Sequence, residues 1–291
     1  MKRKSNLLAV MLCLVLFALM ALGSTSSGSD ETKKVASTNG GEAASVTINE
    51  QIILDQDGIV VTAKEYVSDC IFGDGIKLLL ENNSDKTVTV GCNALIVNNY
   101  MIADLFASEV APGKKVNEVM YLSSSELKAA GIDSVGQVEI YFHVYDSTSF
   151  ENIFDSDCVT IHTSAFDNMD ITPDDTGTEL YNANGIRIVG KTVDENSFWG
   201  TAILLYCENT SGKNVGISVR EMSINGFMIN AIYSTTVYNG KMSFDDITIF
   251  SSDLEEIGIE KIEDVELKFH IYDADSYNTI ADSDAITFSV Q

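Results

Sequence analysis

The chain contains an internal repeat that needs no gap. Residues 58–164 align with residues 185–291 at a constant offset of 127, and 34 of the 107 aligned positions are identical. A period above about 100 residues is too long for a solenoid unit and matches a whole small domain. The repeat therefore predicts a tandem duplication of one small fold.

Turn signals inside each copy separate short apolar segments. Asp57-Gly58 and Asn184-Gly185 predict tight turns, and Asn225-Gly226 between apolar runs predicts a hairpin. Roughly seven or eight short strands in about 110 residues are typical of an immunoglobulin-like sandwich. The predicted fold class is all-β, with two tandem immunoglobulin-like β-sandwich domains over residues 48–165 and 179–291.

Each copy also predicts one short helix. Ser123 with Glu126, and Ser252 with Glu255, have the spacing of a capping box. Gly131 and Gly258 follow where each helix should end.

The N-terminus resembles an export signal. A basic start and the apolar run 7–22 predict a signal peptide over residues 1–23, followed by a flexible tether over 24–47. The 16-residue run is short for a membrane span of about 20 residues, and an uncleaved anchor is the second alternative. We expect a secreted protein, or one attached to the outer face of the envelope. Residues 166–178 predict an acidic linker.

The formal net charge is −25, so no basic surface is available to neutralise phosphates. We therefore expect no nucleic-acid partner, and a membrane partner only through an uncleaved signal anchor. The four cysteines beyond the signal do not fall at equivalent positions of the copies, which predicts mostly reduced thiols. A disulfide among Cys70, Cys92 and Cys158 is left open.

The most similar stretches of the two copies carry a histidine and several aspartates. Strand alternation places Val138, Ile140, Phe142 and Val144 in the core, and His143 on the outer face between tyrosines, as it does His270 in the second copy. A pair between His143 and Asp146 is disfavoured, because a continuing strand points residues three apart to opposite faces. The same reasoning applies to His270 and Asp273.

The aspartates have two interpretations. If the hairpins close, their carboxylates converge on a candidate calcium site, since clustered carboxylates repel one another without a cation. Alternatively, aspartates at strand ends bond nearby backbone amides. The candidate ligands are Asp146, Asp155 and Asp157 in the first copy and Asp273, Asp275, Asp282 and Asp284 in the second. No other cofactor is expected.

Several motifs together resemble a family. They are Leu78-x-x-Glu81-Asn82-x-Ser84-x-Lys86, Val97-Asn98-x-Tyr100-Met101, Ser124-Ser125-x-Leu127 with Gly131-Ile132, and Phe142-His143-x-Tyr145-Asp146 with Asp155-Ser156-Asp157. The chain resembles uncharacterised exported tandem immunoglobulin-like proteins of Gram-positive anaerobes, akin to the mycobacterial immunoprotective extracellular antigen fold. The resemblance implies fold and export. It carries over no catalytic residues.

No nucleophile elbow, metalloprotease motif, phosphate-binding loop or dinucleotide fingerprint occurs in the sequence. We therefore expect no enzyme, but a non-catalytic extracellular or cell-surface binding or adhesion module for an unknown protein or glycan ligand. The alternatives are a calcium-binding protein that uses the duplicated acidic hairpins, and a structural spacer on the envelope.

Overall fold

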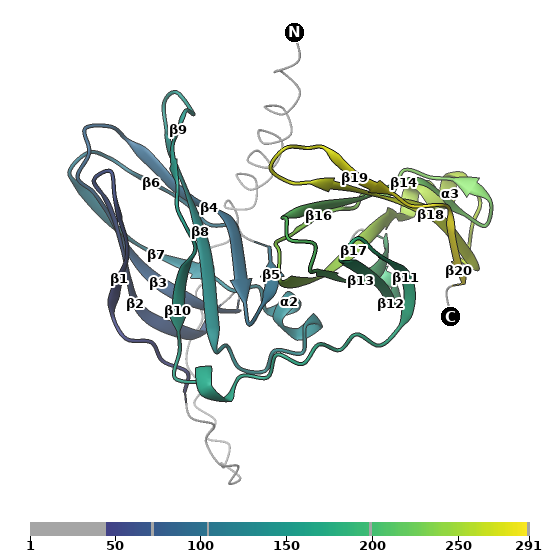
Figure 1. The fold of residues 1–291 in the computed structure, drawn as a ribbon, viewed down its shortest axis with the longest axis horizontal. Coiled ribbons are helices and arrows are strands. Elements are labelled where there is room, and N and C mark those ends of the chain that lie inside the picture. Colours follow the sequence, from purple (N-terminus) through teal and green to yellow (C-terminus); the bar gives the residue numbers. More distant parts are fainter. Residues whose placement is uncertain (1–44, 71–72, 104, 198–199, 290–291) are drawn as a thin grey trace, which may run out of the picture. The chain divides into compact units, whose positions relative to one another are not determined.

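A computed structural model describes residues 45–70, 73–103, 105–197 and 200–289 (Figure 1). The predicted signal peptide and most of the predicted tether therefore lie outside the described residues. Residues 45–291 form one compact unit. None of the helices in the described ranges is long and apolar enough to cross a bilayer.

The first copy is built from two facing groups of antiparallel strands. One group has the order β1 (Gln51–Gln56), β2 (Ile59–Cys70), β3 (Gly73–Asn82) and β7 (Lys114–Tyr121). The other has the order β10 (Val159–His162), β8 (Gln137–Asp146), β4 (Val88–Val97) and β5 (Tyr100–Ile102), with β6 (Ala107–Val110) on β4 and β9 (Asn152–Asp155) on β8.

The second copy repeats this plan. One group has the order β11 (Thr178–Ala183), β12 (Ile186–Ser197), β13 (Gly200–Asn209) and β17 (Lys241–Phe250). The other has β15 (Phe227–Met228), β14 (Val215–Ile224), β18 (Asp264–Asp273) and β19 (Thr279–Asp282), with β16 (Ser234–Val237) on β14 and β20 (Ile286–Ser289) on β18. The protein is thus an all-β sandwich protein, as the sequence predicts.

Strand alternation builds the two apolar cores. The inward side chains of β8 are fully buried in the first core, and those of β18 are fully buried in the second. These are the residues that the sequence assigns to the core: Val138, Ile140, Phe142 and Val144, with Val265, Leu267, Phe269 and Ile271. Each fully buried side chain of this size contributes roughly 1.5–3 kcal/mol to folding.

Among the described residues, each copy has one short α-helix, α2 (Ser124–Ala129) or α3 (Ser251–Glu256), and a 3₁₀ turn, η1 (Phe166–Asn168), follows the first copy. Gly131 and Gly258 have positive φ values of 68° and 71° just beyond the helices, as a left-handed C-terminal residue requires. The capping box predicted at Ser252 is wrong, because α3 begins one residue earlier and Phe250 is its N-cap. Ser123 is the N-cap of α2, but its side chain makes no capping hydrogen bond.

The four described cysteines remain thiols. Cys207 is fully buried, and its Sγ lies 3.3 Å from Tyr233 Oη. Burial raises the pKa of this thiol to about 12, so it is protonated at neutral pH.

Strands of the two copies also pair with each other. β5 pairs in parallel with β17, which joins the strands from β10 to β11 into one sheet. Three side chains on the outer face of the second copy, Val189, Tyr206 and Phe244, belong to the first apolar cluster. Nothing in the sequence predicts this contact.

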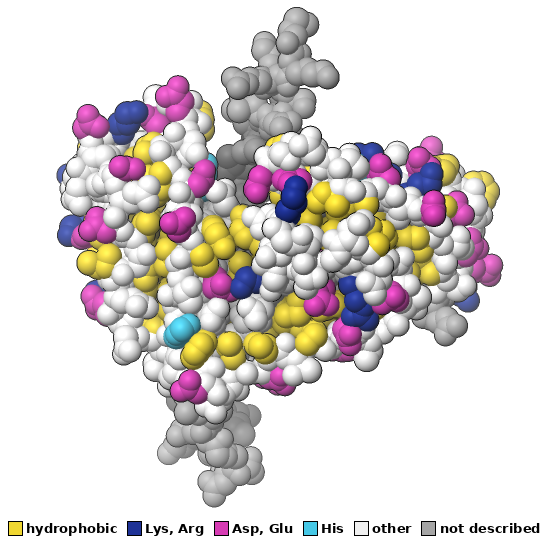
Figure 2. Space-filling view, in the orientation of Figure 1, with side chains coloured by type: hydrophobic (Ala, Val, Ile, Leu, Met, Phe, Trp, Pro, Cys, Tyr) yellow, Lys and Arg dark blue, Asp and Glu magenta, His cyan; other side chains and the backbone are white. Residues whose placement is uncertain are grey.

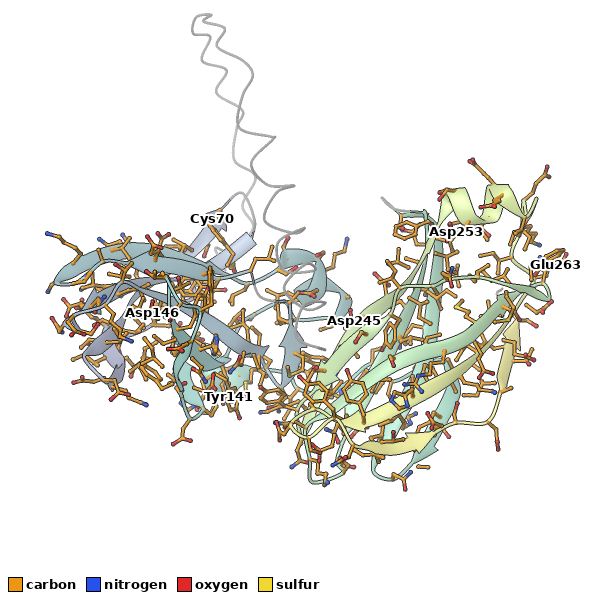
Figure 3. All side chains as sticks on the ribbon, turned by 90° about the horizontal axis from the view of Figure 1, so that it is seen from above. Cys70, Tyr141, Asp146, Asp245, Asp253 and Glu263 are labelled. Atoms are coloured by element: carbon orange, nitrogen blue, oxygen red, sulfur yellow. The ribbon has the colours of Figure 1, made fainter. Side chains whose placement is uncertain are left out.

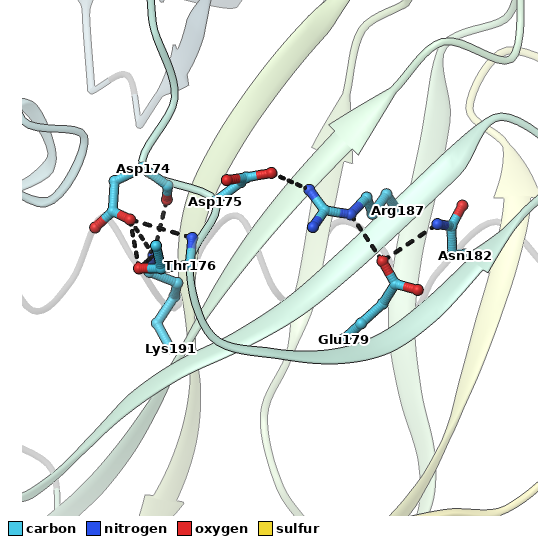
Figure 4. Close-up of polar contacts among 7 residues, drawn as sticks. All are labelled: Asp174, Asp175, Thr176, Glu179, Asn182, Arg187 and Lys191. Atoms are coloured by element: carbon cyan, nitrogen blue, oxygen red, sulfur yellow. Dashed lines mark hydrogen bonds and ion pairs between the residues drawn. The ribbon is translucent and has the colours of Figure 1, made fainter.

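The end of the predicted linker is bonded to β12 (Figure 4). Arg187 Nη1 lies 2.7 Å from Asp175 Oδ2, and Lys191 Nζ lies 3.0 Å from Asp174 Oδ1. The Thr176 hydroxyl, together with Lys191, lowers the pKa of Asp174 to about 2. Asp174 and Asp175 therefore each have a cationic partner on β12.

Candidate functional site on the duplicated hairpin

A histidine–aspartate pair lies on the outer face of the same hairpin in both copies. His143 on β8 is directly opposite Asp155 on β9, and His143 Nδ1 lies 2.6 Å from Asp155 Oδ1. His270 on β18 is opposite Asp282 on β19, with the same atoms 2.6 Å apart. The two copies therefore share the hydrogen-bonded contact as well as the two residue types at the aligned positions.

In the first copy, two amide side chains also donate hydrogen bonds to the Asp155 carboxylate. Asn93 Nδ2 donates to Asp155 Oδ1 at 2.7 Å, and Asn152 Nδ2 donates to Oδ2 at 2.8 Å. Desolvation raises the pKa of Asp155, but the hydrogen bonds from His143, Asn93 and Asn152 outweigh it, and the pKa lies below its usual range. The carboxylate is therefore ionised and held in one orientation.

In the second copy, the histidine of the pair is more deeply buried. The His270 side chain is 11% exposed, against 32% for His143. Arg220, which aligns with Asn93, replaces the amide and places Nη1 3.8 Å from Asp282 Oδ1. The prediction of an outward histidine beside a tyrosine holds for His143, whereas His270 is buried by its neighbours.

An aromatic strip continues from each histidine. In the first copy, the ring of His143 lies 5.4 Å from that of Tyr145, which lies 6.2 Å from that of Phe150. In the second copy, the distances along His270, Tyr272 and Tyr277 are 5.6 and 6.1 Å. We call these two sets of three residues the aromatic strips.

The last ring of each strip is exposed and sits on unusual backbone. Phe150 is 70% exposed and Tyr277 is 78% exposed. Their φ angles are 58° and 59°, in the left-handed region that bulky residues seldom occupy. Such a conformation costs of order 1–3 kcal/mol and is found preferentially at binding and catalytic sites.

The aspartates at the ends of β8 and β18 organise the turn before these rings. Asp146, labelled in Figure 3, accepts backbone hydrogen bonds from Thr148 and Ser149. Asp273 accepts them from Asp275 and Ser276, and its other oxygen lies 2.8 Å from Lys213 Nζ. These are the strand-end bonds to backbone amides that the sequence offers as the alternative to calcium.

The remaining calcium candidates stand apart. Asp157, Asp275 and Asp284 are exposed and lie outside the strands. Across the ranges that the structure describes, no group of three or more His, Cys, Asp or Glu side chains is arranged to hold a metal ion.

The sequence reasoning missed the histidine–aspartate pairs. It tested only the aspartate three residues after each histidine, whereas the partner is twelve residues on and across the hairpin. A hairpin register drawn through residues 146–152 would have found it. A carboxylate on Nδ1 fixes the tautomer and orientation of an imidazole, which serves either catalysis or rigid ligand recognition. Among the described hydrogen bonds, none joins the other ring nitrogen to a serine, threonine or cysteine.

A separate cavity of about 300 Å³ lies in the second copy, between β12, β13 and β20, and none of the predicted site residues lines it. Its lining includes Lys191, Val193, Ile203 and Phe288.

Comparisons with known proteins add little to this geometry. No protein family and no curated protein matches the chain. A Salmonella enterica SafA pilin in complex with the SafB chaperone is 10% identical with a TM-score of 0.22, covering 74% of this chain and 89% of that one. A Porphyromonas gingivalis W83 protein of unknown function is 10% identical with a TM-score of 0.20, covering 84% and 97%. The resemblance drawn from the motifs stays a prediction.

Proposed function

We propose that this protein is a non-catalytic binding protein, exported to the cell surface or beyond, and that its ligand is an uncharged glycan held on the aromatic strips. The observation that carries the proposal is the exposure of Phe150 and Tyr277 at positive φ in both copies. An exposed large ring and a strained backbone both oppose folding, and both features occur at the same position of each copy.

The chemistry of the strips fits a sugar. The negative face of an aromatic ring attracts the weakly positive C–H face of a pyranose. Beside the rings, the carboxylates of Asp155 and Asp282 can accept hydrogen bonds from sugar hydroxyls. Asn93, Asn152 and Arg220, which lie against these carboxylates, have further N–H groups that can donate to a sugar. A net charge of −25 disfavours acidic glycans, which is why the ligand is expected to be neutral.

Divergence between the copies supports a shared role for the strips. About two thirds of the aligned positions differ, yet Phe150 is replaced by another aromatic residue, Tyr277. His143 with Asp155 recurs unchanged as His270 with Asp282. Because a surface ring contributes nothing to either core, packing does not explain its retention.

Stoichiometry gives the sharpest test. A neutral glycan selected on an array should bind the wild-type chain at two sites in calorimetry. Phe150→Ser and Tyr277→Ser should each leave one site, and the double variant should leave none. Leu105→Ser, which removes an exposed leucine elsewhere, should keep both. Failure of every neutral glycan to bind, or binding that the double variant retains, would contradict the proposal and favour a protein ligand or a spacer.

A further inference from the structure

The contact between the copies at β5 and β17 includes backbone pairing and an enclosed ion pair, beside the apolar residues described above. Met242 N donates to Asn99 O at 3.0 Å, and Tyr100 is in register with Met242. Lys241 Nζ lies 2.5 Å from Glu139 Oε2. The side chains of Lys241 and Glu139 are only 15% and 12% exposed, so this contact encloses the pair.

The strands and the ion pair of this contact have counterparts elsewhere in the chain. The offset of 127 relates β5 to β15 and β17 to β7. It also relates Glu139 to Glu266 and Lys241 to Lys114, and both residues are identical between the copies. Both counterparts are exposed.

The counterpart strands are at the ends of their sheets. Within the described residues, β15 pairs only with β14, and β7 pairs only with β3. Each of these two strands therefore has an outer edge without a strand partner. Unpaired edges are the usual sites where another chain adds a strand.

The edge at β15 is apolar as well as open. Tyr100 on β5 is 2% exposed, and its ring stacks on Phe244 of β17 at 5.7 Å. The aligned Phe227 on β15 is 53% exposed, and its neighbour Met228 is 66% exposed. In the first copy, β17 therefore covers the residues of β5. In the second copy, no described strand covers the aligned residues of β15.

We propose that β15 of one molecule pairs in parallel with β7 of a second molecule, in the register that β5 and β17 use within the chain. Lys114 of one molecule then meets Glu266 of the other, as Lys241 meets Glu139. The contact is heterologous, because it joins different surfaces, and it leaves one free edge of each kind for the next molecule. The expected product is a head-to-tail chain of molecules.

The intermolecular contact is weaker than the internal one. Where the second copy places Val189, Leu204 and Phe244 against the first, the outer face around β7 carries Thr62, Lys77 and Asn117. Less apolar area is buried, and two strongly acidic molecules also repel each other. Association should therefore be reversible and visible only at high concentration and physiological salt.

Sedimentation equilibrium of the purified exported chain, up to about 1 mM, tests the proposal. The average mass should rise continuously past that of a dimer. Glu266→Lys and Lys114→Glu each place like charges at the junction and should remain monomeric alone. An equimolar mixture of the two variants restores opposite charges at every mixed junction and should recover the wild-type mass.

Phe227→Ser with Met228→Ser removes the apolar edge without touching a charge or a core residue, and should also give monomers. Circular dichroism and the thermal midpoint of each variant, matched to the wild type, exclude unfolding as the cause. A wild-type chain that stays monomeric, assembly that stops at a dimer, or a mixture that fails to recover mass would overturn the proposal.

Discussion

Single buried polar residues hold the same backbone loops in both copies. Asn82 is 1% exposed, and its Nδ2 donates to the carbonyl oxygens of Lys86 and Val110 at 2.7 and 2.8 Å. Its Oδ1 accepts from the backbone of Ser84 at 2.9 Å. Asn209 makes the same three bonds at the aligned positions. The asparagine therefore ties the start of β4 and the end of β6 to β3.

Replacing the donor amide by a carboxylate should be costly at this position. Asn82→Asp would turn an oxygen toward two carbonyl oxygens, and each buried polar group left unsatisfied costs about 1–3 kcal/mol. We expect the free energy of unfolding, measured with urea, to fall by about 3 kcal/mol. Asn83→Asp, at the exposed neighbouring position, should change it by less than about 0.5 kcal/mol. Equal effects at the two positions would refute the role given to Asn82.

At the scale of the element, the β18–β19 hairpin should be sensitive to acid through Asp273. Its bond to Lys213, followed by those from backbone amides, lowers its pKa from 3.8 to about 2. Since the folded pKa is below the unfolded value, the stabilisation is complete above about pH 4 and disappears as the pH falls toward 2. Asp273→Asn should therefore lower the thermal midpoint at pH 7 but not near pH 2. Asp275→Asn, at an exposed residue of the same turn, should leave the midpoint unchanged at both.

How far sequence predicts an element depends on whether its partner is local. The strands of the two copies begin and end at the same offset over nearly every element, because turn residues and alternation act within a few positions. The outward side of β8 was also predictable. The bond from His143 to Asp155 needs the hairpin register in addition to alternation, and alternation alone does not find it. The burial of His270 was not predictable, because it depends on neighbouring strands.

At the scale of the whole molecule, the two copies have diverged where they face different surroundings. Their inner faces keep apolar residues, whereas outer positions such as Tyr206 and Phe244 align with Leu79 and Asn117. Two tyrosine hydroxyls of the contact, on Tyr100 and Tyr206, are buried without a hydrogen-bond partner in the described residues. Such groups oppose folding, so the apolar contact around them must offset their desolvation.

The ion pair between Lys241 and Glu139 should couple the unfolding of the two copies. Removing one partner of an enclosed pair leaves the other charge poorly solvated, and we expect Lys241→Met to lower stability by about 2 kcal/mol. Because the lost contact joins the copies, scanning calorimetry should show one transition for the wild type and two for the variant.

The duplication supplies the matched control for this variant. Lys114→Met makes the same chemical change at the aligned, exposed lysine, which has no partner of this kind within its own molecule among the described ion pairs. In dilute solution, where molecules do not associate, it should leave both the midpoint and the single transition unchanged. If Lys241→Met also leaves one transition, the two copies are coupled by the apolar residues around Tyr206 and Phe244 and not by the ion pair.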